Sequence, residues 1–200
     1  MIQKKGIDRL VKLGMLTALS IVLIYLIRFP IFPSAPFLEY DMADVPILIG
    51  TFLYGPWCGL ALTAVVSVLQ WLLFSPAVWV GAVMHFCATG SYVLAAGLIY
   101  RGHRTRKGAL VGMGVGAVLQ VLMMIPMNLL FTVHFYGMPR ETVLALLPTA
   151  IIPFNAIKTV VNSVITFFLY KRVAKILKIE LIKTRPPKTD GKMIKEQSDQ

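Results

Sequence analysis

The stretch VPILIGTFLYGPWCGLALTAVVSVLQWLLF, residues 45–74, runs for thirty residues without a charged side chain. As a single helix it would be ~45 Å long at ~1.5 Å per residue, well beyond the ~30 Å hydrocarbon core of a bilayer. Gly55-Pro56 stands in its middle, and a proline after a glycine ends a helix. The stretch therefore predicts two helices, a short one over Val45–Tyr54 and one of ordinary length over Trp57–Phe74.

The composition of the whole chain is that of a membrane protein. Hydrophobic residues make up 57% of its 200 residues and charged residues 14%, and the mean hydropathy is +0.74; soluble proteins carry about 25% charged residues. No polar segment is long enough to form a soluble domain, so we predict one all-α, membrane-embedded unit. The remaining apolar segments are Leu13–Phe29, Ala77–Tyr100, Ala109–Val133 and Leu144–Tyr170.

Basic residues gather in three places: before residue 13, between residues 101 and 107, and from residue 171 onward. If all three clusters are cytoplasmic, an even number of helices must lie between successive clusters. Four segments precede the middle cluster and two follow it, which satisfies this rule only because residues 45–74 are split. We therefore predict six transmembrane helices with both termini cytoplasmic, in a multi-pass protein of the cell membrane.

This topology also sets the expected organisation of the chain. Residues 1–12 form a cytoplasmic N-terminal segment, residues 13–178 the membrane domain, and residues 179–200 a basic, disordered cytoplasmic tail. The net charge of +11 is explained by residues that flank membrane helices and contact the lipid bilayer. Binding to nucleic acid would need a folded polar module with a basic face, and we expect no such partner.

The polar residues expected outside the membrane are concentrated in the first external loop, residues 30–44. It carries three prolines, three aromatic residues and three acids, so it is too rich in proline to be helical. We predict that it folds over the outer mouth of the bundle as a lid; the alternative is a plain connector. Asp44, directly before Val45-Pro46, is interpreted as the cap of the second helix.

One charge stands inside an otherwise uncharged apolar segment, and it marks the candidate site. Lys158 lies within Leu144–Tyr170, and a charge at bilayer depth costs at least ~2.5–3.5 kcal/mol, so such residues face a partner, a cavity or a ligand. Asn155 and Asn162 project from the same helix face as Lys158. Asn128 lies at a depth comparable to Asn155 on the preceding segment, so we expect these polar groups to converge in the outer half of the membrane.

Small residues at four-residue spacing predict close helix contacts. Gly108, Gly112 and Gly116 recur in this way on the fifth segment, and Gly14 with Ala18 on the first. In lipid this pattern lets helix backbones approach closely. We predict that Gly14 and Ala18 form a docking face for a partner helix.

The chain carries none of the patterns expected of an enzyme. His85, His103 and His134 belong to different segments and sides of the membrane, so their spacing does not form a zinc site. The sequence has no His-Glu-x-x-His motif and no Walker motif. We expect no catalytic activity, no bound cofactor or metal, and no hydrolysis of ATP by the chain itself.

Several stretches together resemble the substrate-binding S components of energy-coupling-factor (ECF) vitamin transporters, and in particular their riboflavin branch. These stretches are FLEYD at 37–41 running into DVP at 44–46, YGPWCG at 54–59, and IIPFNAIK at 151–158. The PFNxxK part, followed by YKR at 170–172, is the more specific signal for the flavin branch, and Asn128, nine residues before Gly137, also matches it. The resemblance covers about residues 12–178.

The resemblance implies a vitamin held near the outer surface beneath the first loop. It also implies transport that depends on a transmembrane coupling protein and two ATPase subunits. Carried over by position, the residues that would contact or cover the flavin are Leu38, Glu39, Tyr40, Asp41, Asn128, Asn155 and Lys158. Trp79, together with Tyr40 and Trp71, would flank the flavin ring. We therefore predict a high-affinity riboflavin-binding S component, with riboflavin as transported substrate.

Two positions depart from the riboflavin pattern. Members of that branch often carry a Lys-Asn pair where this chain has Ser67-Val68, and an Asn where it has His85; we keep His85 among the predicted binding residues. The departures leave open another flavin or a vitamin-like heterocycle as substrate. A self-sufficient secondary carrier is the remaining alternative, and internal repeats with broken helices would be typical of it.

Overall fold

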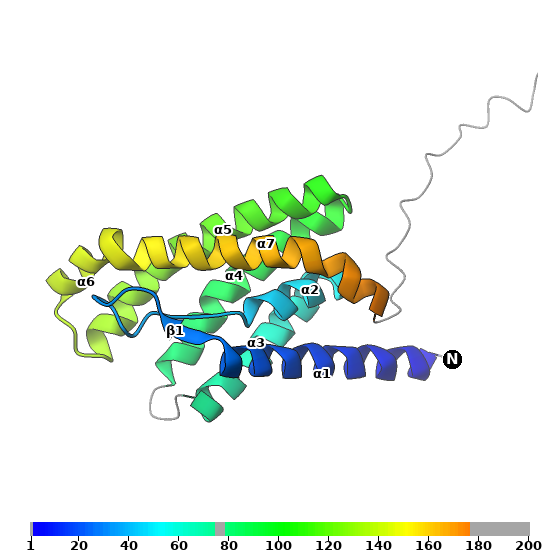
Figure 1. Ribbon diagram of the computed structural model, residues 1–200, viewed down its shortest axis with the longest axis horizontal. Coiled ribbons are helices and arrows are strands. Elements are labelled where there is room, and N and C mark those ends of the chain that lie inside the picture. Colours follow the sequence, from blue (N-terminus) through cyan, green and yellow to red (C-terminus); the bar gives the residue numbers. More distant parts are fainter. Residues whose placement is uncertain (1, 75–78, 177–200) are drawn as a thin grey trace, which may run out of the picture.

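The computed structural model describes residues 2–74 and 79–176, and it is almost entirely helical within these ranges. Figure 1 shows elongated helices that run lengthwise beside one another. The helical elements are α1 (Ile2–Leu26), α2 (Asp44–Tyr54), α3 (Pro56–Phe74), α4 (Val80–Gly102), α5 (Arg106–Met127), α6 (Arg140–Leu146) and α7 (Ile152–Ile176). Two π-helical segments, η1 (Asn128–Thr132) and η2 (Leu147–Ile151), continue α5 and join α6 to α7. Among the described residues, five helical stretches are long and apolar enough to cross a membrane.

The predicted break after Tyr54 is confirmed. Gly55 adopts φ +97°, a conformation that side chains disfavour, and its N–H bonds to the Thr51 carbonyl at 2.8 Å. Pro56 then begins α3. At 11 residues, α2 is only ~16 Å long, shorter than the ~30 Å hydrocarbon core of a bilayer. It is buried along most of its length and packs on α1, α3, α4 and α7.

The glycine pattern on the fifth segment has the predicted consequence. α4 and α5 form the most extensive helix contact of the described chain. A Cβ atom added at Gly112 would lie 2.8 Å from the Ala96 carbonyl oxygen, and one at Gly116 would lie 2.7 Å from the Tyr92 carbonyl. Only glycine allows the two backbones to approach this closely.

Prolines interrupt the regular hydrogen bonding of α5 and of the helix that leads into α7. Pro126 lies in the last turn of α5, immediately before η1, and Pro148 lies inside η2. Proline lacks the N–H that would bond one turn back, so the backbone widens into single π-helical turns. These wide turns lie next to the polar residues of the candidate site, Asn128 and Asn155.

The first loop is non-helical as predicted, but it contains a small sheet. β1 (Arg28–Pro30) pairs antiparallel with β2 (Glu39–Asp41), with Phe29 opposite Tyr40. This two-stranded sheet, absent from the all-α prediction, fixes the loop at one end of the bundle, beside the turn between η1 and α6 (Figure 1).

The two ends of the chain can be compared with the predicted organisation only in part. Residues 2–12, predicted as a cytoplasmic N-terminal segment, are helical and continuous with the rest of α1, which begins at Ile2. The tail predicted for residues 179–200 lies outside the described residues. The start of α1 and the end of α7 lie at the same end of the bundle, opposite the two-stranded sheet (Figure 1).

Candidate substrate-binding site

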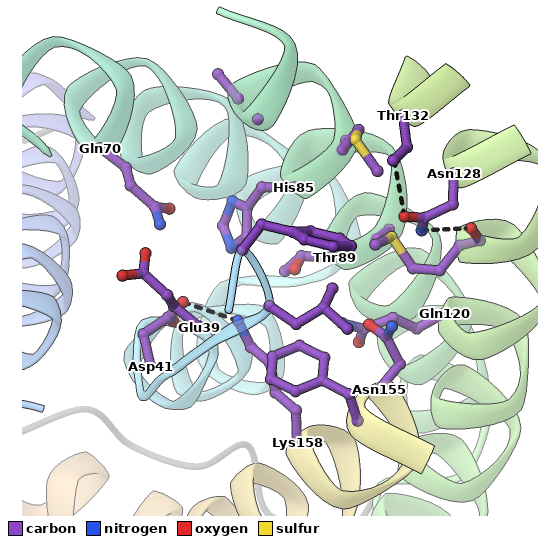
Figure 2. A pocket seen from close by; sticks show the side chains of 18 of the residues that line it. Glu39, Asp41, Gln70, His85, Thr89, Gln120, Asn128, Thr132, Asn155 and Lys158 are labelled. Carbon is purple, nitrogen blue, oxygen red and sulfur yellow. Dashed lines mark hydrogen bonds and ion pairs between the residues drawn. The ribbon is translucent and has the colours of Figure 1, made fainter. Parts of the chain in front are cut away.

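A cavity of ≈ 400 Å³ lies beneath the first loop, between α3, α4, α5 and α7. Its volume is within the range typical of small-molecule sites, ~300–1,000 Å³. Figure 2 shows that polar side chains enter it from several elements, with Asp41 and Lys158 on one side and Gln120, Asn128 and Asn155 on the other. The cavity is therefore polar at both sides.

Most of the predicted site residues line this cavity. They are Leu38, Glu39, Asp41, His85, Asn128, Asn155 and Lys158. Two predicted residues are placed elsewhere. Tyr40, in β2, does not line the cavity, and its ring contacts Phe29. Trp79 is half-exposed and packs edge-on against Phe135 at 5.4 Å. Trp71, rather than Trp79, contributes a tryptophan to the lining.

Other polar lining residues were missing from the predicted set. Gln70 on α3, Gln120 on α5 and Thr89 on α4 all face the cavity. The two glutamines are amides within apolar segments, the same signal that indicated Asn128. The spacing of Gln120 from Asn128, two helical turns, would have placed both on one face.

The amide side chains of the cavity wall differ in whether they have hydrogen-bond partners. Asn128 bonds within its own helix, donating to the Met124 carbonyl at 2.8 Å and accepting from the Thr132 hydroxyl at 3.0 Å. Asn155 likewise donates to the Ile151 carbonyl at 2.8 Å. The amide oxygens of Gln70 and Gln120, in contrast, are buried and have no partner among the described residues. A buried polar atom without a partner is costly, and a donor from a ligand would offset that cost at either oxygen.

Lys158 is neutralised by two acids, one at the end of β2 and one at the start of α2. Its Nζ lies 2.8 Å from Asp41 Oδ2 and 3.9 Å from Asp44 Oδ2, and all three side chains are buried. Carboxylates at this distance offset much of the cost of burying an ammonium group. The lysine therefore faces both the cavity and a paired acid.

The interpretation of Asp44 as a helix cap is wrong. Its carboxylate makes no capping bond in α2; it accepts instead from Thr89 Oγ1 at 2.9 Å and from Asn162 Nδ2 at 3.1 Å. The first turn of α2 lies inside the bundle, where cross-helix donors are nearer than water. Asp44 thus connects α2 to α4 and α7 beneath the cavity.

The two positions that depart from the riboflavin pattern contact one another. Ser67 Oγ lies 2.7 Å from His85 Nδ1, and His85 Nε2 lies 3.4 Å from Asp44 Oδ1. Substitutions at the two positions are therefore physically linked. Together they extend the polar network from α3 through α4 to the acid beside Lys158.

Further bonds fix the first loop over the cavity. Arg28 and Glu39 form an ion pair across the two strands, with Nε 2.7 Å from Oε2. Burial raises the pKa of the Tyr40 phenol, so the hydroxyl keeps its proton and donates to Asn162 Oδ1 at 3.0 Å. The loop is thus bonded both to itself and to α7.

The described residues contain no group of three or more histidine, cysteine or acidic side chains placed to hold a metal. What the cavity offers is a set of amide and hydroxyl groups, an imidazole and two ion pairs, Arg28–Glu39 and Lys158–Asp41, among apolar side chains. Such a wall suits a neutral or weakly polar molecule with a flat apolar body and hydrogen-bonding edges.

Comparison with known proteins identifies the family. Residues 8–170 match the family described as "ECF transporter, substrate-specific component". The chain belongs to this family. The fold agrees: a solved structure described as "Structure and mechanism of the S component of a bacterial ECF transporter" superimposes with a TM-score of 0.75 at 33% identity, covering 86% of this chain and 99% of that one.

Curated relatives of this S component include three riboflavin transporters. RibU of Staphylococcus aureus is 34% identical over 176 residues, which cover 85% of this chain and 92% of the relative. RibU of Lactococcus lactis is 27% identical, covering 84% and 96%, and FmnP of Bacillus subtilis is 28% identical, covering 82% and 90%. The predicted resemblance to the S components, and the expectation of a transport protein rather than an enzyme, are confirmed.

Proposed function

We propose that this S component captures riboflavin at the outer face of the cell membrane and delivers it through an ECF energising module. The observation that carries the proposal is the cavity beneath the first loop, with its row of amides and the paired Lys158. Riboflavin transport is also the activity named for the relatives at 27–34% identity.

The lining is suited to the two parts of riboflavin. Its flat heteroaromatic ring has an edge of amide-like donors and acceptors, which the amides of Gln120 and Asn155 complement. Phe37 and Phe154 offer apolar contact for the ring, and Lys158 is a donor to a carbonyl or hydroxyl group. The unpartnered oxygens of Gln70 and Gln120 would accept from ring N–H or tail hydroxyl groups.

The proposed topology has six membrane helices with both termini cytoplasmic and the first loop outside. Arg9, Arg101, Arg104 and Lys171 gather at the end of the bundle opposite that loop, in support of this orientation. In this arrangement Leu38, Glu39 and Asp41 form the underside of a lid over the cavity. The membrane domain then comprises residues 13–178.

The proposal also assigns the source of energy. Uphill transport by this chain would depend on a transmembrane coupling protein and two ATPase subunits, because the sequence has no nucleotide-binding motif. Gly14 and Ala18, which lie exposed on α1 and outside the cavity lining, are the proposed contact for the coupling protein. Close approach of a helix to small residues supports this assignment.

Fluorescence titration tests the substrate. Riboflavin fluorescence should be quenched on addition of the detergent-purified protein, and riboflavin should copurify with it. Titrations with FMN and thiamine measure specificity, and FMN is included because Ser67 and His85 depart from the riboflavin pattern. No quenching at micromolar riboflavin, together with copurification of a different vitamin, would contradict the proposal.

Uptake assays separate the S component from a self-sufficient carrier. Vesicles containing the isolated protein should bind riboflavin without accumulating it, whereas co-reconstitution with the energising module and ATP should give accumulation. Full accumulation by the isolated protein would instead favour the carrier.

A further inference from the structure

A second cavity lies at the other end of the bundle and shares no lining residue with the first. Its volume is ≈ 660 Å³, and it lies between the C-terminal ends of α2 and α4, the first turns of α3 and α5, and α7. Five cationic side chains line it and no carboxylate does: Arg9, Arg101, Arg104, Arg106 and Lys171. The cavity is therefore a concentrated positive site.

None of these five cations is held in a salt bridge in the described part of the chain. Asp8, next to Arg9 in the chain, is paired with Lys12 at 2.6 Å. Arg9 instead donates to the Tyr54 carbonyl at 3.3 Å and lies over the Tyr54 ring, which holds it at the cavity wall.

Helix dipoles account for only part of this arrangement. Arg101 lies in the last turn of α4, where a cation is favourable, whereas Lys171 lies before the last turn of α7. Arg106, however, is the first residue of α5, and the positive end of that helix disfavours a cation there. Arg104 lies just before it. Both face the same cavity, so an anion placed there would be attracted by the side chains and by the α5 N-terminus together.

Neutral groups of the cavity suit the same ligand. The Tyr54 hydroxyl is buried and has no partner among the described residues, and Tyr54 lines the cavity. Trp57, also in the lining, is 67% exposed, as expected of a tryptophan at a membrane–water interface. Basic pockets between membrane helices on the cytoplasmic side bind phosphate headgroups.

We infer that this basic cavity binds a phosphate group, in the first place the headgroup of an anionic phospholipid of the cytoplasmic leaflet. The phosphate lies between Arg104 and Arg106, within reach of the α5 N-terminus, and the Tyr54 hydroxyl provides a neutral donor. Such a lipid would hold together the ends of α2, α4 and α5. The inference concerns the end of the bundle opposite the flavin cavity and does not depend on which vitamin is transported.

The test compares two double variants with the same change in charge. Arg104→Gln/Arg106→Gln removes two lining cations, and Lys107→Gln/Arg172→Gln removes two exposed cations of the same region that do not line the cavity. Full-length protein is titrated with phosphatidylglycerol or phosphatidylcholine and bound lipid is counted by native mass spectrometry. Size-exclusion profiles and riboflavin binding confirm that both variants are folded.

Wild-type protein should retain phosphatidylglycerol in preference to phosphatidylcholine. The cavity variant should bind phosphatidylglycerol roughly 10- to 30-fold more weakly, and the control variant within about twofold of wild type. Inorganic phosphate is the second probe: if it raises the melting temperature of wild type but not of the cavity variant, free phosphate also occupies the site.

Three results would overturn the inference. The first is equal binding of the two phospholipids to wild type. The second is an equal loss of phosphatidylglycerol in the two variants. The third is a cavity variant that keeps its lipid but no longer assembles with the energising module, which would make the cavity a protein contact.

Discussion

Lys158 and Asp41, 117 positions apart in the chain, form a buried ion pair in which Nζ lies 2.8 Å from Oδ2. One partner belongs to α7 and lines the cavity, and the other belongs to β2 of the loop that covers it. The position of the loop is therefore coupled to the charge of a residue proposed to contact the substrate. A ligand that competes for the lysine would loosen the loop, and one that leaves the pair intact would be enclosed by it.

The losses of stability on removing each charge of this pair should not be additive. Lys158→Met leaves Asp41 and Asp44 buried without their cation, at a cost to the free energy of unfolding of about 3–5 kcal/mol. Asp41→Asn leaves the lysine with Asp44 at 3.9 Å. The double variant should lose less stability than the sum of the single variants, measured by denaturation with sodium dodecyl sulfate. Additive losses would show that the two charges do not interact.

The same lysine should also contribute directly to binding. Lys158→Ala should weaken riboflavin binding by roughly 1.5–3 kcal/mol, a factor of about ten or more, if its ammonium group donates to the ligand. Fluorescence titration of the variant against wild type measures the effect. Unchanged affinity would make the lysine a structural partner of Asp41 alone.

Gln120 offers a test of the cavity that separates binding from stability. Its amide oxygen is buried without a partner in the described chain, so Gln120→Leu removes an unsatisfied group and should leave the melting temperature unchanged or higher. Riboflavin affinity should fall by about tenfold, since a ligand donor loses its acceptor. Thr63→Val is the matched control, because Thr63 is equally buried, bonds within its own helix and does not line the cavity. Equal loss of affinity in both variants would exclude a direct role for Gln120.

The sequence predicted those features that depend on local rules. Gly55-Pro56 located the break between α2 and α3, because the positive φ and the missing N–H are properties of these residues alone. Lys158 located the site, because a charge in an apolar segment requires a partner wherever the helix packs. Asn155 followed from its helical spacing to Lys158.

Features that depend on where helices meet were not predictable in this way. Asp44 before Val45-Pro46 has the sequence of a helix cap, yet its partners are Thr89 and Asn162. That choice follows from the burial of the first turn of α2, which no local pattern specifies. Trp79 is an aromatic residue that could flank a flat ring, but it packs against Phe131 and Phe135 and does not line the cavity. The ion pair itself joins two segments whose contact depends on the whole topology.

Two nearby glycines of α5 test whether the close contact with α4 stabilises the protein. Gly112→Ala would place a Cβ atom 2.8 Å from the Ala96 carbonyl, so the helices must separate, and the free energy of unfolding should fall by about 1–3 kcal/mol. Gly114→Ala meets no atom within 4 Å and should be neutral or stabilising by up to about 1 kcal/mol. Thermal denaturation of the two variants in the same detergent measures the difference. Similar melting temperatures would show that the glycines are not needed for this contact.

The last prediction concerns the partner-docking face on α1. Gly14 and Ala18 are exposed, and a Cβ atom added at Gly14 meets nothing within 4 Å. Leucine at both positions should therefore leave the isolated subunit folded and its riboflavin affinity within about twofold of wild type. In the complex the added bulk would prevent close approach of a partner helix, so vitamin uptake should be abolished and the coupling protein should no longer copurify.

A control variant separates this effect from added bulk in general. Gly114→Leu places the same side chain on an exposed position of α5, and it should preserve uptake as well as binding. Uptake, complex pull-down and fluorescence titration are measured on both variants. If the α1 variant loses binding together with uptake, Gly14 and Ala18 serve internal packing. If it retains full uptake, the coupling protein docks on another face, because a leucine pair on α1 leaves no room for a close helix contact there.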